Sequence, residues 1–124
     1  MQRYLFIANG IGITPFRSIL RDLQSHPKEA EITLIYAVDS PTRLIFKDFF
    51  DELAEQSWFN VEYISEVSWS KRLAAIKQEV SAYTPDQSLY YLSGSPRAIT
   101  DIQSMLSDQG ISHERIKTDS FAGL

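Results

Sequence analysis

Gly10-Ile11-Gly12-Ile13-Thr14-Pro15 and Ser93-Gly94-Ser95-Pro96 are two short stretches that share one design. Each follows an apolar run and ends in a hydroxyl residue followed by proline. A Thr or Ser oxygen can cap the first turn of a helix, and proline suits the first helical position because no N–H is needed there. Both stretches therefore predict a buried strand that turns into a helix, with Thr14 and Ser95 as the caps. Helix N-termini of this kind attract phosphate and other anions.

Along the rest of the chain, continuous apolar runs alternate with segments in which apolar residues recur at helical spacing. Apolar or β-branched runs predict strands at residues 4–8, 32–38, 61–64 and 89–92, and a more polar run predicts an edge strand at 112–118. Apolar residues at helical spacing predict helices around 16–23, 46–53, 73–80 and 99–106, the last of them closed by Gly110. This order predicts a three-layer, Rossmann-like α/β domain, in which an open, mostly parallel five-stranded sheet carries helices on both faces. In such a sheet, a ligand binds in the crevice at the carboxyl ends of neighbouring strands.

The composition limits the possible functions. With 124 residues the chain has the size of one domain, and 44% hydrophobic residues are ordinary for a folded protein. The net charge of −4 argues against a nucleic-acid partner. The sequence has no cysteine, which excludes disulfides and thiolate chemistry, and His26 and His113 are too far apart in sequence to suggest a metal site. No apolar run is long enough to cross a bilayer, so we expect no membrane insertion and a cytoplasmic location, or a domain that faces the cytoplasm.

The stretches that predict the fold also resemble, in order, the landmarks of the NAD(P)-binding domain of the ferredoxin–NADP reductase superfamily. Residues 9–20 resemble the first-loop motif of that family, with Asn9 where the family usually has a glycine. Residues 36–53 resemble its second strand, loop and helix. Residues 92–96 resemble its Cys-Gly-Ser-Pro segment, with Ser93 in the cysteine position, and residues 119–121 resemble its acidic-X-aromatic ending. The resemblance covers nearly the full chain.

The resemblance implies the NAD(P)H-binding module of a flavin-dependent oxidoreductase. The family normally pairs this module with an N-terminal β-barrel that binds FAD or FMN. We interpret residues 1–124 as a single pyridine-nucleotide-binding domain that does not include the barrel. The flavin is then expected on another part of a longer polypeptide or on a partner subunit, and this domain by itself is expected to be inactive. The terminal electron acceptor is not indicated by the sequence.

Residues of the two loops are the main candidates for cofactor binding. Gly10 and Gly12 would let the backbone approach a diphosphate closely, although a tight turn without a ligand needs glycine as well. The resemblance implies that Thr14 contacts the nicotinamide region in addition to capping its helix. The predicted cofactor-binding residues are Gly10, Gly12, Ile13, Thr14, Pro15, Ser65, Gly94, Ser95 and Pro96.

Three residues are catalytic candidates through the resemblance alone. Ser93 is implied to lie beside the reacting atoms of the nicotinamide and the flavin, and a simple hydrogen bond at the strand end is the structural alternative. Phe121 is implied as the aromatic residue that covers the flavin ring, and Asp119 as the neighbouring carboxylate. A hydrophobic anchor for a terminal strand is the alternative role for Phe121.

The choice between NADH and NADPH depends on the residues that follow the third strand. NADP-specific relatives commonly have Ser-Arg there, so that the guanidinium pairs with the 2′-phosphate. This chain has Ser65-Glu66, and a carboxylate repels a phosphate, so the sequence favours NADH. Lys71 and Arg72 follow closely, and either could meet a phosphate instead, which leaves NADPH open.

Two other functions are alternatives to the oxidoreductase. A regulatory or adaptor domain would keep the fold without redox activity, and it is favoured by Asn9 and Ser93, which depart from the family motifs. A hydrolase on a similar sheet is disfavoured because the chain lacks a Gly-X-Ser-X-Gly elbow.

Overall fold

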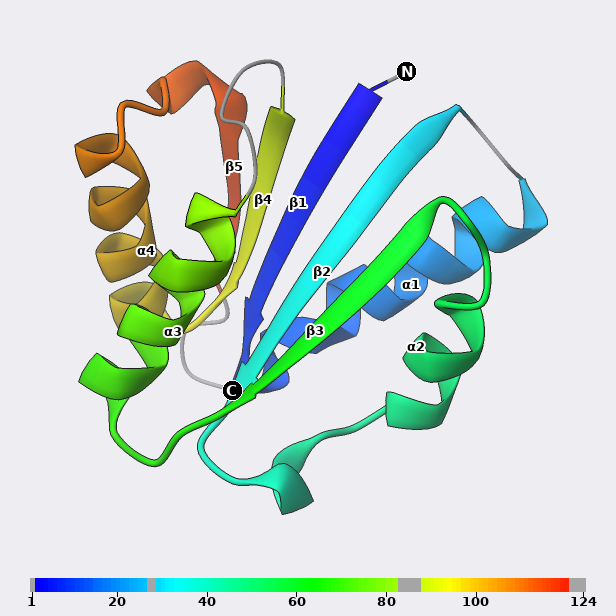
Figure 1. Cartoon of the computed structure of the whole chain (residues 1–124), viewed down its shortest axis with the longest axis horizontal. Coiled ribbons are helices and arrows are strands. Elements are labelled where there is room, and N and C mark those ends of the chain that lie inside the picture. The colour runs from blue at the N-terminus through cyan, green and yellow to red at the C-terminus, as the bar shows by residue number, and fades with distance from the viewer. Residues whose placement is uncertain (1, 27–28, 83–87, 121–124) are drawn as a thin grey trace.

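The computed structural model describes residues 2–26, 29–82 and 88–120, which form one five-stranded sheet with helices on both faces (Figure 1). The strands are β1 (Gln2–Asn9), β2 (Ala30–Val38), β3 (Phe59–Ser65), β4 (Ser88–Gly94) and β5 (Ile116–Ser120). Their order in the sheet is β3-β2-β1-β4-β5, and every neighbouring pair is parallel. The predicted fold class is confirmed.

The direction in which strands are added reverses at β1. The chain places β2 and β3 on one side of β1 and then returns to place β4 and β5 on the other side. Ligands of doubly wound sheets bind at such a reversal, outside the carboxyl ends of the strands. Here the reversal lies between β1 and β4, where Ala8 is paired with Ser93.

Four helices cover the two faces of the sheet. The pair α1 (Ile13–Ser25) and α2 (Lys47–Leu53) lies on one face, and the pair α3 (Trp69–Ser81) and α4 (Pro96–Asp108) lies on the other (Figure 1). Alternate residues of β1 enter the two cores: Phe6 packs with Phe16 of α1, whereas Ile7 belongs to the core that contains Ile76 of α3. Burial on both faces explains why β1 is an uninterrupted apolar run.

The ends of several elements follow from local chemistry. As predicted, Gly110 closes α4: it has a φ of 85°, its N–H donates to the Ser107 carbonyl (3.0 Å), and the Ile111 N–H donates to the Leu106 carbonyl (3.1 Å). These two bonds are the Schellman pattern, which favours glycine at this position. In the described ranges, no helix has both the length and the apolar character needed to cross a membrane.

Two predicted boundaries were wrong. The edge strand was expected at 112–118, but residues His113–Arg115 form a 3₁₀ turn and β5 begins only at Ile116. The second helix was expected around residues 46–53, with Phe46 in its apolar face, but α2 begins at Lys47. Phe46 has a φ of 60°, which a right-handed helix cannot contain, so this residue ends the loop before α2.

Candidate functional site

The two loops that resemble each other in sequence lie in direct contact. An ideal Cβ placed on Gly12 would be 2.3 Å from the carbonyl oxygen of Ser93 and 2.7 Å from the amide nitrogen of Gly94. A Cβ on Gly94 would be 3.3 Å from the carbonyl oxygen of Asn9. The prediction that the two junctions are neighbours is therefore confirmed. The structure also gives Gly12 a reason for being glycine that requires no ligand: any side chain would collide with the β4 backbone.

The helix starts at the two junctions differ. At the second, Ser95 is the N-cap and its hydroxyl accepts the Ala98 N–H (3.2 Å), with Pro96 at the first helical position, as predicted. At the first, Thr14 is not the cap. A 3₁₀ turn over Gly10–Gly12 runs straight into α1, which begins at Ile13, so the N-cap is Gly12, which has no side chain to act as a cap. Thr14 is thereby placed inside the first turn, with its side chain exposed.

A cavity of about 370 Å³ opens beside the first junction, at the carboxyl ends of β1 and β2. Gly10 forms part of its wall with a φ of 61°, and apart from Gly10 and its two chain neighbours no heavy atom of the described residues lies within 4 Å of the place where a Cβ on Gly10 would be. The backbone is thus open to close approach by a ligand here, as expected for Gly10. The cavity is lined by Asn9, Gly10, Ile11, Tyr36, Val38, Asp39, Thr42, Arg43, Ile45 and Arg72.

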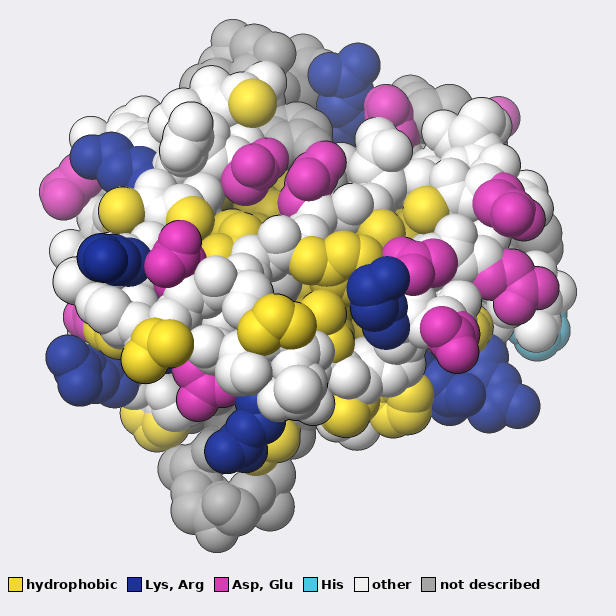
Figure 2. All heavy atoms as spheres, turned by 60° about the horizontal axis from the view of Figure 1, so that its bottom comes forward, with side chains coloured by type: hydrophobic (Ala, Val, Ile, Leu, Met, Phe, Trp, Pro, Cys, Tyr) yellow, Lys and Arg dark blue, Asp and Glu magenta, His cyan; other side chains and the backbone are white. Residues whose placement is uncertain are grey.

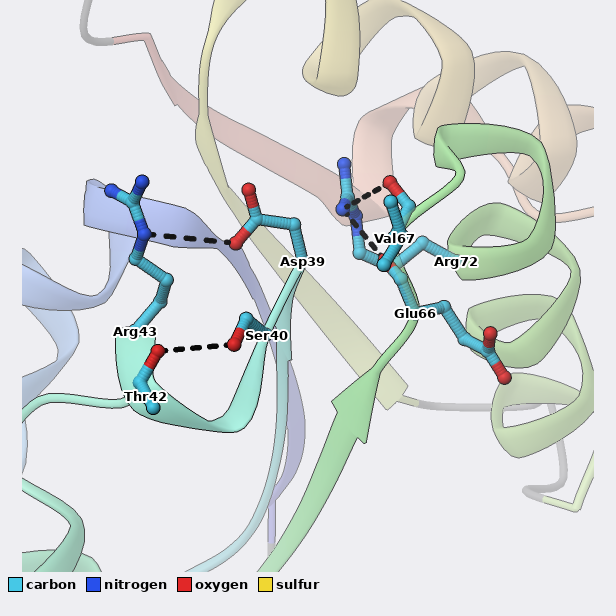
Figure 3. Close-up of polar contacts among 7 residues, drawn as sticks. All are labelled: Asp39, Ser40, Thr42, Arg43, Glu66, Val67 and Arg72. Carbon is cyan, nitrogen blue, oxygen red and sulfur yellow. Dashed lines mark hydrogen bonds and ion pairs between the residues drawn. The ribbon is translucent and has the colours of Figure 1, made fainter.

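Two arginines and one carboxylate determine the charge of this cavity. Arg43 Nε lies 4.0 Å from the Asp39 carboxylate, and the Ser40 and Thr42 hydroxyls are 3.0 Å apart in the same loop. Arg72 comes from α3, and its Nη1 donates to the carbonyls of Glu66 (2.8 Å) and Val67 (3.4 Å). Figure 3 shows Arg43 and Arg72 on either side of Asp39, with the Glu66 carboxylate directed away from them. The charged residues of the lining are Arg43, Arg72 and Asp39, which gives it one net positive charge and suits an anionic ligand.

Tyr36 lines the cavity and holds part of its wall by a hydrogen bond. It is fully buried, and its hydroxyl accepts the N–H of Ile45 (3.0 Å), which fixes the loop that precedes α2. Burial raises the pKa of Tyr36 above its ordinary value, so the side chain stays neutral at physiological pH. Tyr36 is therefore a structural support rather than an acid.

Two polar atoms near the reversal point remain without partners. Among the described residues, neither Asn9 Oδ1 nor Ser93 Oγ has a hydrogen-bond partner, although both atoms are buried and Ser93 as a residue is only 2% exposed. Buried polar groups are rarely left unpaired unless a ligand or water satisfies them. A carboxamide, which carries both donors and an acceptor, has the chemistry to satisfy both atoms, so the residues present fit a nicotinamide nucleotide.

The structure places several of the other predicted site residues by strand pairing and burial. Ser93 and Asp119 are register partners on β4 and β5, so two of the three catalytic candidates are brought together, while Phe121 lies outside the described residues. Ile13 is fully buried in the core, which leaves only its backbone for a ligand. Ser65, at the end of β3, is exposed and pairs with Val38, one of the lining residues.

Sequence reasoning did not single out the wall formed by the β2–α2 loop. Asp39, Thr42, Arg43 and Ile45 all line the cavity, yet none was among the predicted site residues. The position of this loop in the sequence could have indicated it, because a polar, proline-containing loop follows the carboxyl end of a buried strand. Figure 2 shows this edge of the sheet, where hydrophobic side chains are interspersed with charged ones.

The sequence of this chain is similar to those of known oxidoreductases. Residues 6–104 match the family described as the oxidoreductase NAD-binding domain. The chain is 24% identical to the terephthalate 1,2-dioxygenase reductase component 1 of a Comamonas species, over 94% of this chain and 37% of that protein. It is 28% identical to NADH-cytochrome b5 reductase 2 of Lodderomyces elongisporus, over 84% of this chain and 40% of that protein.

Solved structures share the fold at low sequence identity. A flavohemoglobin from Malassezia yamatoensis with bound FAD and heme aligns with a TM-score of 0.80 and 20% identity, over 98% of this chain and 32% of that one. The ferredoxin-NADP+ reductase from Plasmodium falciparum aligns with a TM-score of 0.76 and 16% identity, over 97% and 52%. The chain thus spans about half or less of the proteins that it matches. Because the family match covers most of its length, the chain belongs to the oxidoreductase NAD-binding domain family.

Proposed function

We propose that residues 1–124 form the nucleotide-binding domain of an NAD(P)H-dependent flavin oxidoreductase, with the flavin held by a separate domain or subunit. The observation that carries this proposal is the cavity beside Gly10, which opens at the carboxyl ends of β1 and β2. The bound nucleotide would supply a hydride, and the flavin would accept it. The contribution of this chain is to bind and orient the nucleotide.

Each part of the site has a distinct role in this proposal. Gly10 and the backbone of the Gly10–Gly12 turn, which has no side-chain cap, receive the diphosphate. Arg43 and Arg72 supply the positive charge that balances it. Ser93 and Asn9 offer their unpaired oxygens to the carboxamide of the nicotinamide ring. Thr14, exposed in the first turn of α1, is available to the nicotinamide end because its hydroxyl is not the cap.

The remaining predicted residues take supporting roles. Ile13 and Pro15 hold the first turn of α1, and Gly94, Ser95 and Pro96 form the second loop against which the first loop packs. Ser65 is positioned at the adenosine end, beside Val38. Asp119, paired with Ser93, and Phe121 are proposed to face the flavin.

We further propose that NADH is preferred over NADPH. Asp39 places a carboxylate in the cavity, where it can accept hydrogen bonds from ribose hydroxyls and repels an added phosphate. Arg43 and Arg72, the two arginines of the lining, are assigned to the diphosphate in this proposal. Neither guanidinium is therefore assigned to a 2′-phosphate.

A titration followed by amide chemical shifts tests both proposals. We expect NADH to shift the amides of Gly10, Ile11 and Arg43 at submillimolar to millimolar concentration, with NADPH weaker by several-fold. ADP-ribose should shift Arg43 but not Ser93, because it lacks the nicotinamide. Unchanged amide shifts at these positions in millimolar NADH would contradict the proposed function, and equal affinities for NADH and NADPH would contradict the preference alone.

A regulatory or adaptor domain is the second candidate, and Ser93 is the observation that favours it. A serine hydroxyl stands where the family resemblance places a cysteine. Such a domain would bind NADH but would not support flavin reduction. Mixing the domain with NADH and a free flavin barrel from a relative, and recording flavin absorbance, separates the two candidates.

A further inference from the structure

One aromatic residue beside the cavity has an unusual backbone conformation. Phe46 has φ 60° and ψ 20°, and it is the only non-glycine residue with positive φ in the part of the chain that the structure describes. The left-handed region is unfavourable for bulky L-residues because the Cβ crowds the following carbonyl oxygen. Such a conformation persists only where surrounding contacts enforce it, and it is common at ligand sites.

Arg17 contacts the ring of Phe46. Its guanidinium carbon lies 5.0 Å from the centre of the Phe46 ring and 5.3 Å from the centre of the Phe49 ring, within the range of cation–π attraction. Arg17 Nε is buried and has no hydrogen-bond partner among the described residues, whereas its guanidinium stacks on the two rings. The Phe46 carbonyl accepts the Phe50 N–H (3.1 Å), which couples this residue to the start of α2.

The strained residue is adjacent to the cavity wall. Ile45, its neighbour, lines the cavity and donates its N–H to the Tyr36 hydroxyl, and Arg43 lies two residues further back. Arg17 itself belongs to α1, the helix that continues from the opposite wall formed by Asn9–Ile11. The stacking of Arg17 therefore connects the two loops between which the cavity opens.

We propose that Arg17 is a positioning residue for the nucleotide cavity. Its guanidinium holds Phe46 in the left-handed conformation, and this sets the places of Ile45 and Arg43 in the wall. When the stacking is lost, Phe46 relaxes to a more favourable φ and the loop shifts away from Asn9–Ile11. The inference rests on the proposed function, because it assigns Arg17 a role in nucleotide affinity without contact to the nucleotide.

Substitution of Arg17 tests the proposal with two independent measurements. We expect Arg17→Ala to weaken NADH binding about tenfold, Arg17→Lys to retain part of the affinity because a cation remains over the rings, and the matched control Arg21→Ala, on the exposed face one turn further along α1, to bind normally. The second measurement is the three-bond coupling between the amide and α protons of Phe46, which reports φ without any ligand. It should change in Arg17→Ala and stay unchanged in Arg21→Ala.

A double-mutant cycle excludes the alternative that Arg17 touches the nucleotide directly. Glycine adopts positive φ without strain, so in a Phe46→Gly background the substitution Arg17→Ala should change NADH affinity less than twofold. A full tenfold loss in that background, or an unchanged Phe46 coupling in Arg17→Ala, overturns the proposal. If the wild-type chain does not bind NADH, the proposed function fails, while the Phe46 coupling still tells whether Arg17 controls the loop.

Discussion

The junction between β4 and α4 is closed by the atoms of the protein itself, whereas the junction between β1 and α1 is left open. At the β4–α4 junction, the Ser95 hydroxyl satisfies the Ala98 N–H and Pro96 removes the need for another partner. At the β1–α1 junction, the turn Gly10–Gly12 continues into the helix and no side chain caps the start. The two junctions touch each other through Gly12 and the Ser93 backbone.

The two junctions also differ in their position relative to the cavity. The first N–H groups of a helix need partners. The Ser95 hydroxyl supplies one at α4, whereas at α1 no side chain does so and the Ile13 N–H donates to the Gly10 carbonyl of the preceding turn. The uncapped junction is also the one that lines the cavity, through Gly10 and Ile11. The capped junction lines no part of it and serves mainly as the surface against which the first loop rests.

The largest expected effect comes from Gly12→Ala, which breaks the contact between the junctions. A Cβ there would lie 2.3 Å from a backbone oxygen, so the β4 end or the first loop must move. We expect the free energy of unfolding to fall by about 3 kcal/mol, as for severe overpacking. Urea unfolding followed by circular dichroism measures this change.

Gly10→Ala is the matched control for that prediction. Its Cβ would enter open space, so only the unfavourable φ of 61° contributes, at about 1 kcal/mol. If Gly12→Ala proves no more destabilising than Gly10→Ala, the first loop does not pack against the β4 backbone in solution.

A smaller effect distinguishes the two hydroxyl residues. Ser95→Ala removes a cap and should lower the free energy of unfolding by about 1 kcal/mol. Thr14→Ala should stay within about 0.5 kcal/mol of wild type, because alanine is at least as good a helix former inside a turn. The same urea titration compares them. Equal losses from both substitutions would mean that Thr14 does cap α1 in solution.

The sequence predicts the fold better than it predicts the site, for physical reasons. Strand order follows from alternation and crossover rules, and Ser95-Pro96 is a local signal that acts within one turn of helix. Thr14-Pro15 carries the same local signal, but the preceding 3₁₀ turn displaces the helix start by two residues, so that the N-cap is Gly12. That turn depends on contact with Ser93, which is distant in sequence.

The cavity wall was unpredictable for a similar reason. Asp39 and Arg43 become site residues only because β2 lies next to β1, so that the loop after β2 faces the loop after β1. The left-handed Phe46 runs against the preference of its own residue type, and no local pattern indicates it. Its ring instead contacts Arg17, a residue of α1 that is distant in sequence.

A comparison of similar size uses two buried tyrosines, one on each side of β1 in the sheet. Tyr36, under the open junction, accepts the Ile45 N–H, so Tyr36→Phe leaves that N–H unpaired and should lower the free energy of unfolding by about 1 kcal/mol. Tyr90 lies on β4, and its buried hydroxyl has no partner within the described ranges, so Tyr90→Phe should be neutral or slightly stabilising. A loss from Tyr90→Phe equal to that from Tyr36→Phe would show that the Tyr90 hydroxyl is paired in solution.

The loss of stability at alkaline pH provides a second comparison of Tyr36 and Tyr90. Burial raises the pKa of both Tyr36 and Tyr90 above the ordinary tyrosine value of about 10. The unfolded chain therefore loses these phenol protons first, so the contribution to stability is complete below pH about 10 and decreases as the pH rises further. Each Tyr→Phe variant should lose less stability than wild type between pH about 9 and about 11, whatever its effect at neutral pH. An alkaline decline as steep in Tyr36→Phe as in wild type would mean that this phenol ionises in the folded protein, and hence that the wall it supports is open to water.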